Sequence, residues 1–392
     1  MVGATDSRRP GEPLAAIVGV AESDLGTTQK SILELQTQAA HRALTDAGLS
    51  MADVDGLFTN GAARFSATQV AEYMGIRPHW TDSTMAGGSS YEIFISHAAE
   101  AIRSGVVEVA LICYGSNQRS LRSRRLDGVV DAQLPDGQFE APYGPLSPIS
   151  LYAMAAQRHM HEFGTTSSQL AEVAVAAREW ALLNPVAFRF GAGPLTTEDV
   201  VASPMISSPL HSYDCCLVTD GGGAVVMTSI ERARDLRHAP VHVIGYGEAS
   251  TNATMSQIPS LVSTGAVDSG MRAFTMAGVR PAEIDVVQVY DSFTITVLLT
   301  LEALGFCPQG EAGRFLEDGR GRPGGSFPLN TSGGGLSYCH PGMFGIFLVI
   351  EAVRQLRGTC GDRQVPRAEL AVAHGTGGVL STHATLVLAV ER

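Results

Sequence analysis

The feature that most constrains the fold is an internal repeat, in which segments of the second half resemble segments of the first. Ala15–Ser23 resembles His242–Ser250, since each has two β-branched residues, a glycine, a short extended run and a carboxylate. Ala43–Phe58 resembles Ala273–Gln288, and both read as a helix that ends at Ala-Gly, a turn and a buried strand. The repeat indicates two copies of one structural unit.

A third and weaker pair extends the repeat toward the ends of the two halves. Ala98–Gly105 precedes the apolar run VALICYG, and Ile350–Gly358 precedes, after extra residues, the run LAVAHGTG. Each half therefore reads strand, helix, strand, glycine-rich turn, helix, strand. This alternation favours an α/β protein with mostly parallel strands, and the unbroken apolar runs fit strands buried on both faces.

The spacing between matched segments gives the domain organisation. It grows from about 227 to about 252 residues along the chain, so insertions separate the matched elements. Residues 118–200 match nothing in the second half, and we interpret them as an inserted loop domain that carries function. We expect a mobile lead-in at 1–13, a first half at 14–237 and a second half at 238–392.

Composition excludes several classes of protein. The net charge of −12 makes nucleic acid an unlikely partner, and no apolar run is long enough to span a membrane. The N-terminal residues lack the apolar core of a signal peptide. Six cysteines without a C-x-x-C pair favour reduced thiols in the cytoplasm, and no His, Cys, Asp and Glu spacing suggests a metal site.

Four motifs in this duplicated frame resemble those of the thiolase superfamily over nearly the whole chain. They are DCCLVTDGGGAVVMTS (214–229), VYDSFT (289–294), LNTSGGGLSYCHPG (329–342) and AHGTGG (373–378). The last takes the place of the family's Cys-x-Gly-Gly. The resemblance implies a duplicated five-layer αβαβα sandwich that is usually dimeric.

The departures from the family pattern fall on its catalytic positions. Met85 occupies the place of the nucleophilic cysteine, and a thioether cannot form an acyl-enzyme. His374 stands where the second cysteine is expected, and Tyr290 replaces an Asn or His. Only the histidine of the Gly-His-Pro motif remains, as His340. Ser89 follows Met85 and is interpreted as a helix-capping residue.

Within the superfamily, the chain is most similar to the lipid-transfer-protein group related to the sterol-carrier-protein-x thiolases, and above all to steroid side-chain aldolases. That resemblance implies retro-aldol cleavage of a β-hydroxyacyl-CoA to a ketone and a shorter acyl-CoA, without a cysteine acyl-enzyme. It implies a small partner with a zinc ribbon and an OB fold. It also assigns catalysis to the tyrosines of the YD-F and LSY motifs, which are Tyr290 and Tyr338 here.

The residues themselves fit this chemistry. A retro-aldol step needs a base for the β-hydroxyl, a donor that stabilises the enolate and an acid that quenches it. We assign the first task to Tyr290 and the last to Tyr338, or the reverse. His340 is the candidate donor to the thioester oxygen, and His374 completes the polar cluster. Asp291 either orients a neighbour or caps a helix. No cofactor is required beyond the CoA of the substrate.

A basic segment is the candidate site for the CoA phosphates. Four arginines fall within seven consecutive positions of this acidic chain: Arg119, Arg122, Arg124 and Arg125. Such a cluster favours a site for phosphates or for an acidic partner, and a solvated loop is the alternative. Met85 and Ser89 are weaker candidates for substrate contact.

Two other functions stay open at this stage. One is a Claisen-type thiolase that uses a displaced cysteine, for which Cys339 is the candidate. The other is a non-catalytic lipid carrier or scaffold subunit. Cys215 and Cys216 are interpreted as packing residues on the approach to a core strand.

Overall fold

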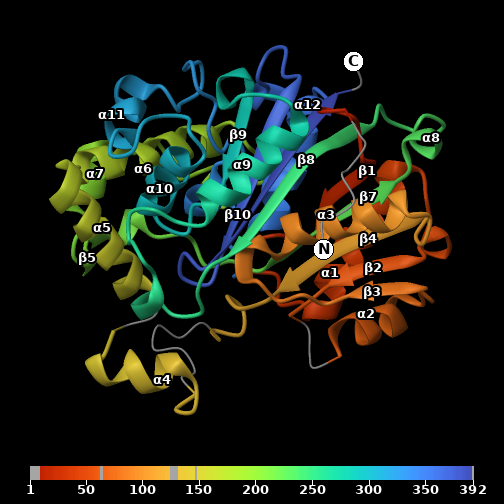
Figure 1. Cartoon of the computed structure of the whole chain (residues 1–392), viewed down its shortest axis with the longest axis horizontal. Helices are drawn as coiled ribbons and strands as arrows, with labels where there is room; N and C mark the ends of the chain where they lie inside the picture. The colour runs from red at the N-terminus through yellow and green to blue at the C-terminus, as the bar shows by residue number, and fades with distance from the viewer. Residues whose placement is uncertain (1–8, 62–64, 124–130, 146–147, 391–392) are drawn as a thin grey trace.

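A computed structural model describes residues 9–61, 65–123, 131–145 and 148–390. Within these ranges nine strands form one sheet (Figure 1). In sheet order they are β3 (Trp80–Asp82), β2 (Gly56–Thr59), β4 (Val109–Ser116), β7 (Gly221–Thr228), β1 (Ala15–Glu22), β8 (Val241–Ser250), β11 (Thr382–Val390), β10 (Leu370–Gly377) and β9 (Val286–Val289). The first five belong to one half of the chain and the last four to the other.

The sheet is mixed, so the expectation of mostly parallel strands is wrong. The β2 strand runs parallel to β3 and β4, and β9 runs parallel to β10. The other neighbouring pairs, including β1 with β7 and β10 with β11, are antiparallel. The apolar runs reflect burial on both faces, which helices impose whatever the strand direction.

The internal repeat is confirmed element by element. The helix α1 (Ile32–Ala47) ends at Gly48 with φ 76°, and α9 (Ala266–Ala277) ends at Gly278 with φ 65°. In each case a short 3₁₀ turn and a strand follow, β2 in the first half and β9 in the second. Both glycines adopt the left-handed conformation that closes a helix, which is why the two sequences match there.

The halves stack into five layers. The outer helices of the first half are α1 and α2 (Ser66–Met74), and those of the second half are α9 and α10 (Thr294–Ala303). Between the two groups of strands lie α3 (Ser90–Arg103) and α12 (Gly345–Leu356). The short helices α8 (Ile230–Ala233) and α11 (Ala312–Leu316) complete the frame. No helix in the described ranges is long and apolar enough to cross a bilayer.

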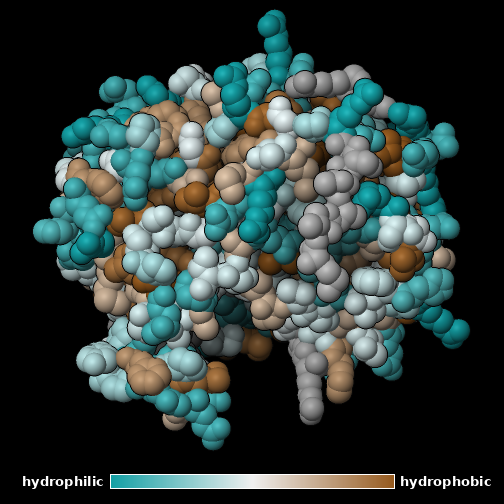
Figure 2. Space-filling model, viewed as in Figure 1, coloured by the Kyte–Doolittle hydropathy of each residue, from teal (hydrophilic) through white to brown (hydrophobic). Residues whose placement is uncertain are grey.

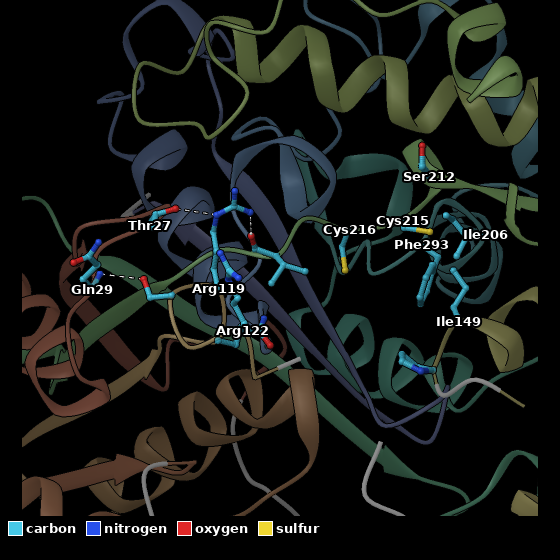
Figure 3. Close-up of a pocket in the computed structure, with 14 residues that line it drawn as sticks. Thr27, Gln29, Arg119, Arg122, Ile149, Ile206, Ser212, Cys215, Cys216 and Phe293 are labelled. Atoms are coloured by element: carbon cyan, nitrogen blue, oxygen red, sulfur yellow. Dashed lines mark hydrogen bonds between the residues drawn. The ribbon is translucent and has the colours of Figure 1, made fainter. Parts of the chain in front are cut away.

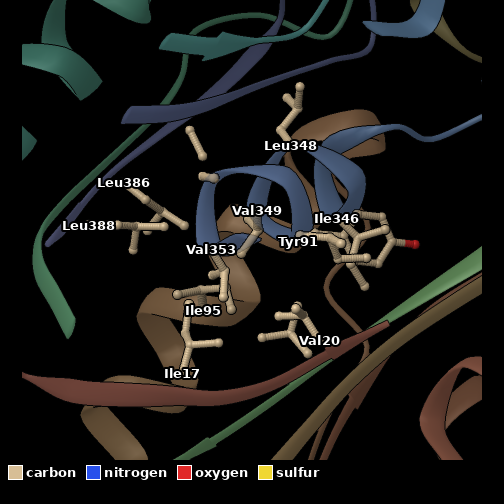
Figure 4. Close-up of a cluster of buried hydrophobic side chains, with 14 of the residues drawn as sticks. Ile17, Val20, Tyr91, Ile95, Ile346, Leu348, Val349, Val353, Leu386 and Leu388 are labelled. Carbon is tan, nitrogen blue, oxygen red and sulfur yellow. The ribbon is translucent and has the colours of Figure 1, made fainter. Parts of the chain in front are cut away.

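The central layer forms the main core (Figure 4). Ile17 of β1, Ile95 of α3 and Val349 of α12 meet Leu386 of β11 there, and none of these side chains is exposed. Burying such a side chain contributes roughly 1.5–3 kcal/mol. The two central helices therefore hold the halves together, and their N-terminal ends lie at the candidate site.

The insertion contains regular structure. It comprises α4 (Pro135–Phe139), α5 (Ile149–Phe163), α6 (Ser167–Leu182) and α7 (Thr197–Ala202), followed by the hairpin β5 (Met205–Ser207) and β6 (Leu210–His211). Thr166 and Gln169 form a capping box at the start of α6. This helix packs on α10 and α11 and on the glycine-rich segment 334–338, so the insertion covers the second half.

Part of the insertion projects away from the body. In Figure 1 the segment around α4 stands apart at the lower left, and Figure 2 shows apolar surface there. Phe139 and Tyr143 are 61% and 88% exposed.

Residues 9–13, within the predicted lead-in, lie against the end of α9. The N–H of Gly11 donates to the carbonyl of Met276 at 2.9 Å. Residues 1–8 lie outside the described part of the chain.

Candidate active site

Two cavities adjoin where the insertion meets the two halves. The inner one has a volume of about 350 Å³ and the outer one about 820 Å³. Gln118, Pro148, Cys216 and Phe293 line both, so the outer cavity leads into the inner one.

The outer cavity has a polar and an apolar side (Figure 3). On one side are Thr27, Gln29 and Arg119, and the opposite side carries Ile149, Ile206 and Phe293. A ligand with a charged end and an apolar end fits this division.

The inner cavity contains Tyr290 and His340, two of the predicted site residues. The phenol oxygen of Tyr290 lies 3.1 Å from Nε2 of His340 and accepts a hydrogen bond from the N–H of Phe344 at 3.2 Å. Burial raises the pKa of Tyr290 well above 10, while the hydrogen bond from Phe344 lowers it. The phenol therefore carries its proton at neutral pH, and negative charge on its oxygen is favoured by the start of α12.

Tyr290 is placed by the end of β9 and by a glycine. Its own N–H donates to the carbonyl of His374 at 3.0 Å, which anchors it to β10. Its ring packs against Gly88: a Cβ there would lie 2.2 Å from the ring. A side chain at position 88 would displace the tyrosine.

Asp291 holds the turn that carries the histidine. Its carboxylate accepts the N–H groups of Gly335 at 2.7 Å and Leu336 at 3.2 Å. Burial raises the pKa of Asp291 to about 7, although these hydrogen bonds lower it. Asp291 thus orients the glycine-rich segment; the helix-capping alternative is wrong for α10, whose N-cap is Phe293.

His340 is fixed through its backbone as well as through Tyr290. Its N–H donates to Oγ1 of Thr219 at 3.0 Å, and its carbonyl accepts from Nε2 of Gln118 at 3.2 Å. Because Nε2 of its ring faces the phenol of Tyr290, His340 is arranged as that tyrosine's proton partner.

The structure does not bring Tyr338 to the cavity. Its hydroxyl donates to the carboxylate of Glu22, which forms a two-pronged ion pair with Arg354. Burial and the charge of Glu22 raise the pKa of Tyr338 well above 10. The ring packs beside Phe344 and Phe347 inside the central core. The predicted catalytic pair of tyrosines is therefore not assembled.

His374 also points away from the cavity. Its Nδ1 lies 2.8 Å from Oγ1 of Thr385 and its Nε2 lies 3.4 Å from Nδ1 of His383. Burial, followed by the charge of His383, lowers the pKa of His374 well below 6.5. It is a neutral core histidine, and it supports the site only through the carbonyl that anchors Tyr290.

The two residues near the start of α3 do not line either cavity. Met85 is 60% exposed, and Ser89 is fully buried. Ser89 is the N-cap residue of α3, as predicted, but its hydroxyl donates to the carbonyl of Ala86 at 2.8 Å and caps no N–H group of the helix. What lines the inner cavity at this place is the backbone of Gly87 and Gly88.

The basic segment is divided. Arg119 and Arg122 line the outer cavity, whereas Arg124 and Arg125 lie outside the described residues. Arg119 donates to Thr27 and to the carbonyl of Val218 and forms no ion pair among the described residues.

Asp220 braces this side of the cavity. Its carboxylate accepts from the N–H of Thr28 and the N–H of Ser120, which ties together the two loops that carry the polar lining residues.

A second pair of arginines was not predicted. The guanidinium groups of Arg119 and Arg189 lie 4.8 and 5.7 Å from the ring of Phe188, and that of Arg178 lies 5.8 Å from Tyr213. Burial and the charge of Arg189 lower the pKa of Arg178. The unpredicted pair is Arg178 and Arg189. These two residues are separated in the sequence, so they form no local basic cluster that sequence analysis could have detected.

Three other cavity residues were also missed as candidates. Ser292, Thr376 and Cys216 line the inner cavity. Ser292 follows Asp291 in the YD-F motif, which was a usable signal, whereas Cys216 was interpreted as a packing residue. Cys339, the predicted displaced nucleophile, is fully buried and does not line either cavity, and burial raises its pKa well above 9.

Comparisons with known proteins agree with this architecture. The family described as "Thiolase C-terminal domain-like" matches residues 247–390. The chain is 39% identical to the "Steroid side-chain-cleaving aldolase" of Thermomonospora curvata over 93% of this chain and 95% of that protein. It is 38% identical to the "17-hydroxy-3-oxo-4-pregnene-20-carboxyl-CoA lyase" of Mycobacterium tuberculosis, over 93% and 96%.

A solved structure gives the same answer for the fold. The chain superimposes on the "Ltp2-ChsH2(DUF35) aldolase" with a TM-score of 0.88 and 35% identity, covering 98% of this chain and 99% of that one. With the duplicated five-layer frame, these relatives show that the chain belongs to the thiolase superfamily, in the thiolase-like group that includes the steroid side-chain-cleaving aldolases.

Proposed function

We propose that the protein is a carbon–carbon lyase that cleaves a β-hydroxyacyl-CoA by a retro-aldol step, without a cysteine acyl-enzyme. The observation that carries the proposal is the hydrogen-bonded pair of Tyr290 and His340 on the inner cavity. Met85 at the place of the nucleophile, exposed and outside the cavity, supports it. The names of the two relatives, an aldolase and a CoA lyase, support the same reaction class.

The reaction starts at the β-hydroxyl. The phenol oxygen of Tyr290 takes the hydroxyl proton while the phenol passes its own proton to Nε2 of His340. The bond between the α and β carbons breaks, the β carbon becomes a ketone, and the electron pair forms the thioester enolate. The proton held by His340 then returns through Tyr290 to the α carbon, which releases the shorter acyl-CoA. One proton moves from oxygen to carbon, so no external acid is needed.

The outer cavity suits the two ends of such a substrate. We assign the CoA phosphates to the side with Arg119 and Arg122 and the apolar acyl group to the side with Ile149 and Ile206. A steroid side-chain thioester, as in the names of the relatives, is the acyl class that we propose.

An arginine substitution tests the CoA assignment. We expect Arg119→Met to raise KM for the CoA thioester about tenfold with little change in kcat, because a phosphate contact is made equally in the ground and transition states. Arg314→Met, which removes an exposed arginine paired with Glu311, is the control. An unchanged KM in Arg119→Met would move the CoA phosphates elsewhere.

Product analysis tests the reaction itself. The purified chain, with any partner encoded beside it, is mixed with a branched β-hydroxyacyl-CoA. A ketone and a shorter acyl-CoA, formed at a rate that iodoacetamide does not change, support the lyase. Splitting of a β-ketoacyl-CoA that needs free CoA and is blocked by iodoacetamide contradicts it.

A Claisen-type thiolase is the second candidate, and one observation favours it. Cys216 lines both cavities, which gives that reaction a cysteine in a better place than Cys339. Cys216→Ala separates the candidates, because it abolishes thiolysis and leaves retro-aldol cleavage. A non-catalytic carrier or scaffold remains the third hypothesis, and it predicts no turnover of either substrate.

We also propose an assembly in the cytoplasm: a homodimer that binds a small zinc-ribbon and OB-fold subunit. The β3 strand lies at the edge of the sheet, where a second copy can pair with it, and Trp80 on it is 44% exposed. The solved neighbour's name joins Ltp2 to ChsH2(DUF35), which supports a partner subunit. The molar mass measured by light scattering tests both the homodimer, for the chain alone, and the heteromeric complex, for the chain mixed with any small partner subunit encoded beside it.

A further inference from the structure

The loop from His340 to Phe344 surrounds the phenol oxygen of Tyr290. It follows the glycine-rich turn 334–338, ends where α12 begins, and belongs to no helix or strand. Alternate residues of the loop face the phenol. Nε2 of His340 lies 3.1 Å from the oxygen, the N–H of Phe344 donates to it at 3.2 Å, and the carbonyl of Gly342 lies 3.5 Å from it. The position of the loop therefore sets the surroundings of the catalytic oxygen.

The residues between these three contact a second tyrosine, Tyr114, which lies near the end of β4. Its hydroxyl donates to the carbonyl of Pro341 at 2.6 Å and accepts from the N–H of Met343 at 3.1 Å. Burial raises the pKa of Tyr114 to about 12, so the hydroxyl keeps the proton that it donates. One side chain thus joins two points of the loop, on either side of Gly342.

A glycine permits this close approach. Gly342 has a φ of 105°, and a Cβ there would lie 3.2 Å from the hydroxyl oxygen of Tyr114 and 3.4 Å from the amide group of Gln118. Gln118 also donates to the carbonyl of His340 at 3.2 Å. Tyr114 and Gln118 therefore hold the loop from the first half of the chain, while Tyr290 meets it from the second half.

Tyr114 reaches the loop from the core and not from the cavity. It is 3% exposed, it lines neither the inner nor the outer cavity, and its ring lies beside that of Tyr91, with centroids 5.1 Å apart. It can therefore affect a substrate only through the loop. Because no helix or strand ladder holds the loop, loss of the two hydrogen bonds lets it shift, and a shift of about 1 Å in a catalytic group can cost about 100-fold in rate.

We propose that Tyr114 is a positioning residue of the site. Its hydroxyl fixes the loop, and the loop aligns the N–H of Phe344 and the ring of His340 with the phenol of Tyr290. This inference rests on the proposed lyase function, in which His340 takes the phenol proton and the N–H of Phe344 stabilises negative charge on the phenol oxygen. Tyr114 exchanges no proton, so the balance of the reaction is unchanged.

The first test compares two buried tyrosines. Tyr114→Phe keeps the ring and removes both hydrogen bonds, and we expect kcat for ketone release to fall about 30-fold while KM changes less than about twofold. Tyr91→Phe is the matched control, because Tyr91 is fully buried, lines neither cavity and donates to Oδ1 of Asn60 at 3.0 Å. Rates are taken per folded molecule, as judged by circular dichroism. A native kcat in Tyr114→Phe, or an equal loss in the two variants, would overturn the inference.

A measurement on Tyr290 itself separates this inference from the lyase proposal. In protein labelled with ¹³C at the ζ carbon of tyrosine, the Tyr290 resonance is the one that Tyr290→Phe removes, and its chemical shift reports the hydrogen bonding of the phenol. We expect Tyr114→Phe to move this resonance and Tyr91→Phe to leave it in place. An unmoved resonance in Tyr114→Phe overturns the positioning role, even in an active lyase. A moved resonance in a protein that cleaves no β-hydroxyacyl-CoA keeps the role of Tyr114 and rejects the lyase instead.

Discussion

The surroundings of two tyrosines that the sequence treats alike differ in how their polar groups are satisfied. Around Tyr338, Glu22 and Arg354 pair with each other and with the phenol. Burial raises the pKa of Glu22, but Arg354 and the phenol outweigh it and leave that pKa below 4.5. The region around Tyr338 thus contains charged groups, and these groups are hydrogen-bonded to one another.

Around Tyr290 the polar groups have no counter-charge. Both oxygens of Glu92 lack a partner among the described residues, and the carboxyl is wedged between Gly345 and Gly375. Burial raises the pKa of Glu92 to about 8. The hydroxyl of Thr376 also lacks a partner among the described residues. Buried polar groups are normally hydrogen-bonded, as they are around Tyr338, and the region around Tyr290 departs from that rule. Proteins break that rule chiefly at functional sites, which is why the geometry favours Tyr290 as the catalytic tyrosine.

The largest expected effect is a difference in turnover between the two tyrosines. Tyr290→Phe removes the proton-transferring oxygen, and we expect the cleavage rate to fall about 10³-fold. Tyr338→Phe removes a hydroxyl that contacts Glu22 and no cavity residue, and we expect less than about a threefold change in kcat. The measurement is ketone release from a β-hydroxyacyl-CoA at saturating substrate.

Equal losses of turnover in Tyr290→Phe and Tyr338→Phe would contradict the difference expected between the two tyrosines and would make Tyr338 a catalytic residue again. Circular dichroism of both variants guards against a loss that comes from misfolding, and each rate is taken per folded molecule.

The next effect concerns stability at the other tyrosine. Glu22→Gln leaves Arg354 without its counter-charge in a mostly buried place, and we expect the free energy of unfolding to fall by about 3 kcal/mol. Glu283→Gln, at an exposed pair with Arg280, is the control, and its loss should stay below about 1 kcal/mol. Urea unfolding measures both. A loss in Glu22→Gln no larger than in the control would mean that the pair is solvated.

Much of the fold was readable because it depends on local rules. The repeat was visible because Gly48 and Gly278 close equivalent helices in a conformation that glycine favours. The mixed direction of the strands was not visible, because burial on both faces gives β4 and β9 the same apolar run whatever their neighbours.

The site was readable only in part because motifs do not encode side-chain direction. Tyr290 and His340 were found, and they meet across 50 positions of sequence. Tyr338 is two residues from His340, yet the turn sends its hydroxyl to Glu22, which carried no signal of its own. The side chain of His374 lies on the face of β10 that points away from the cavity. Side chains alternate between the two faces of a strand, but the sequence does not say which face borders the cavity.

The smallest effect is a slope of stability with pH, and it tests whether the region of Tyr290 is uncharged. Because the folded pKa of Glu92 lies near 8 and its ordinary value is 4.5, the folded protein binds one more proton than the unfolded chain between these values. Stability from this group is complete below about pH 4.5 and is lost as the pH rises toward 8. Burial raises the pKa of Asp291 to about 7 in the same direction, but Asp291 is present in both proteins compared and cancels. The native protein should therefore lose about 2 kcal/mol relative to Glu92→Gln between pH 5 and pH 7 in urea unfolding. A constant difference over that range would mean that Glu92 has a partner or water in solution, and the contrast between the two tyrosines would then rest on Thr376 alone.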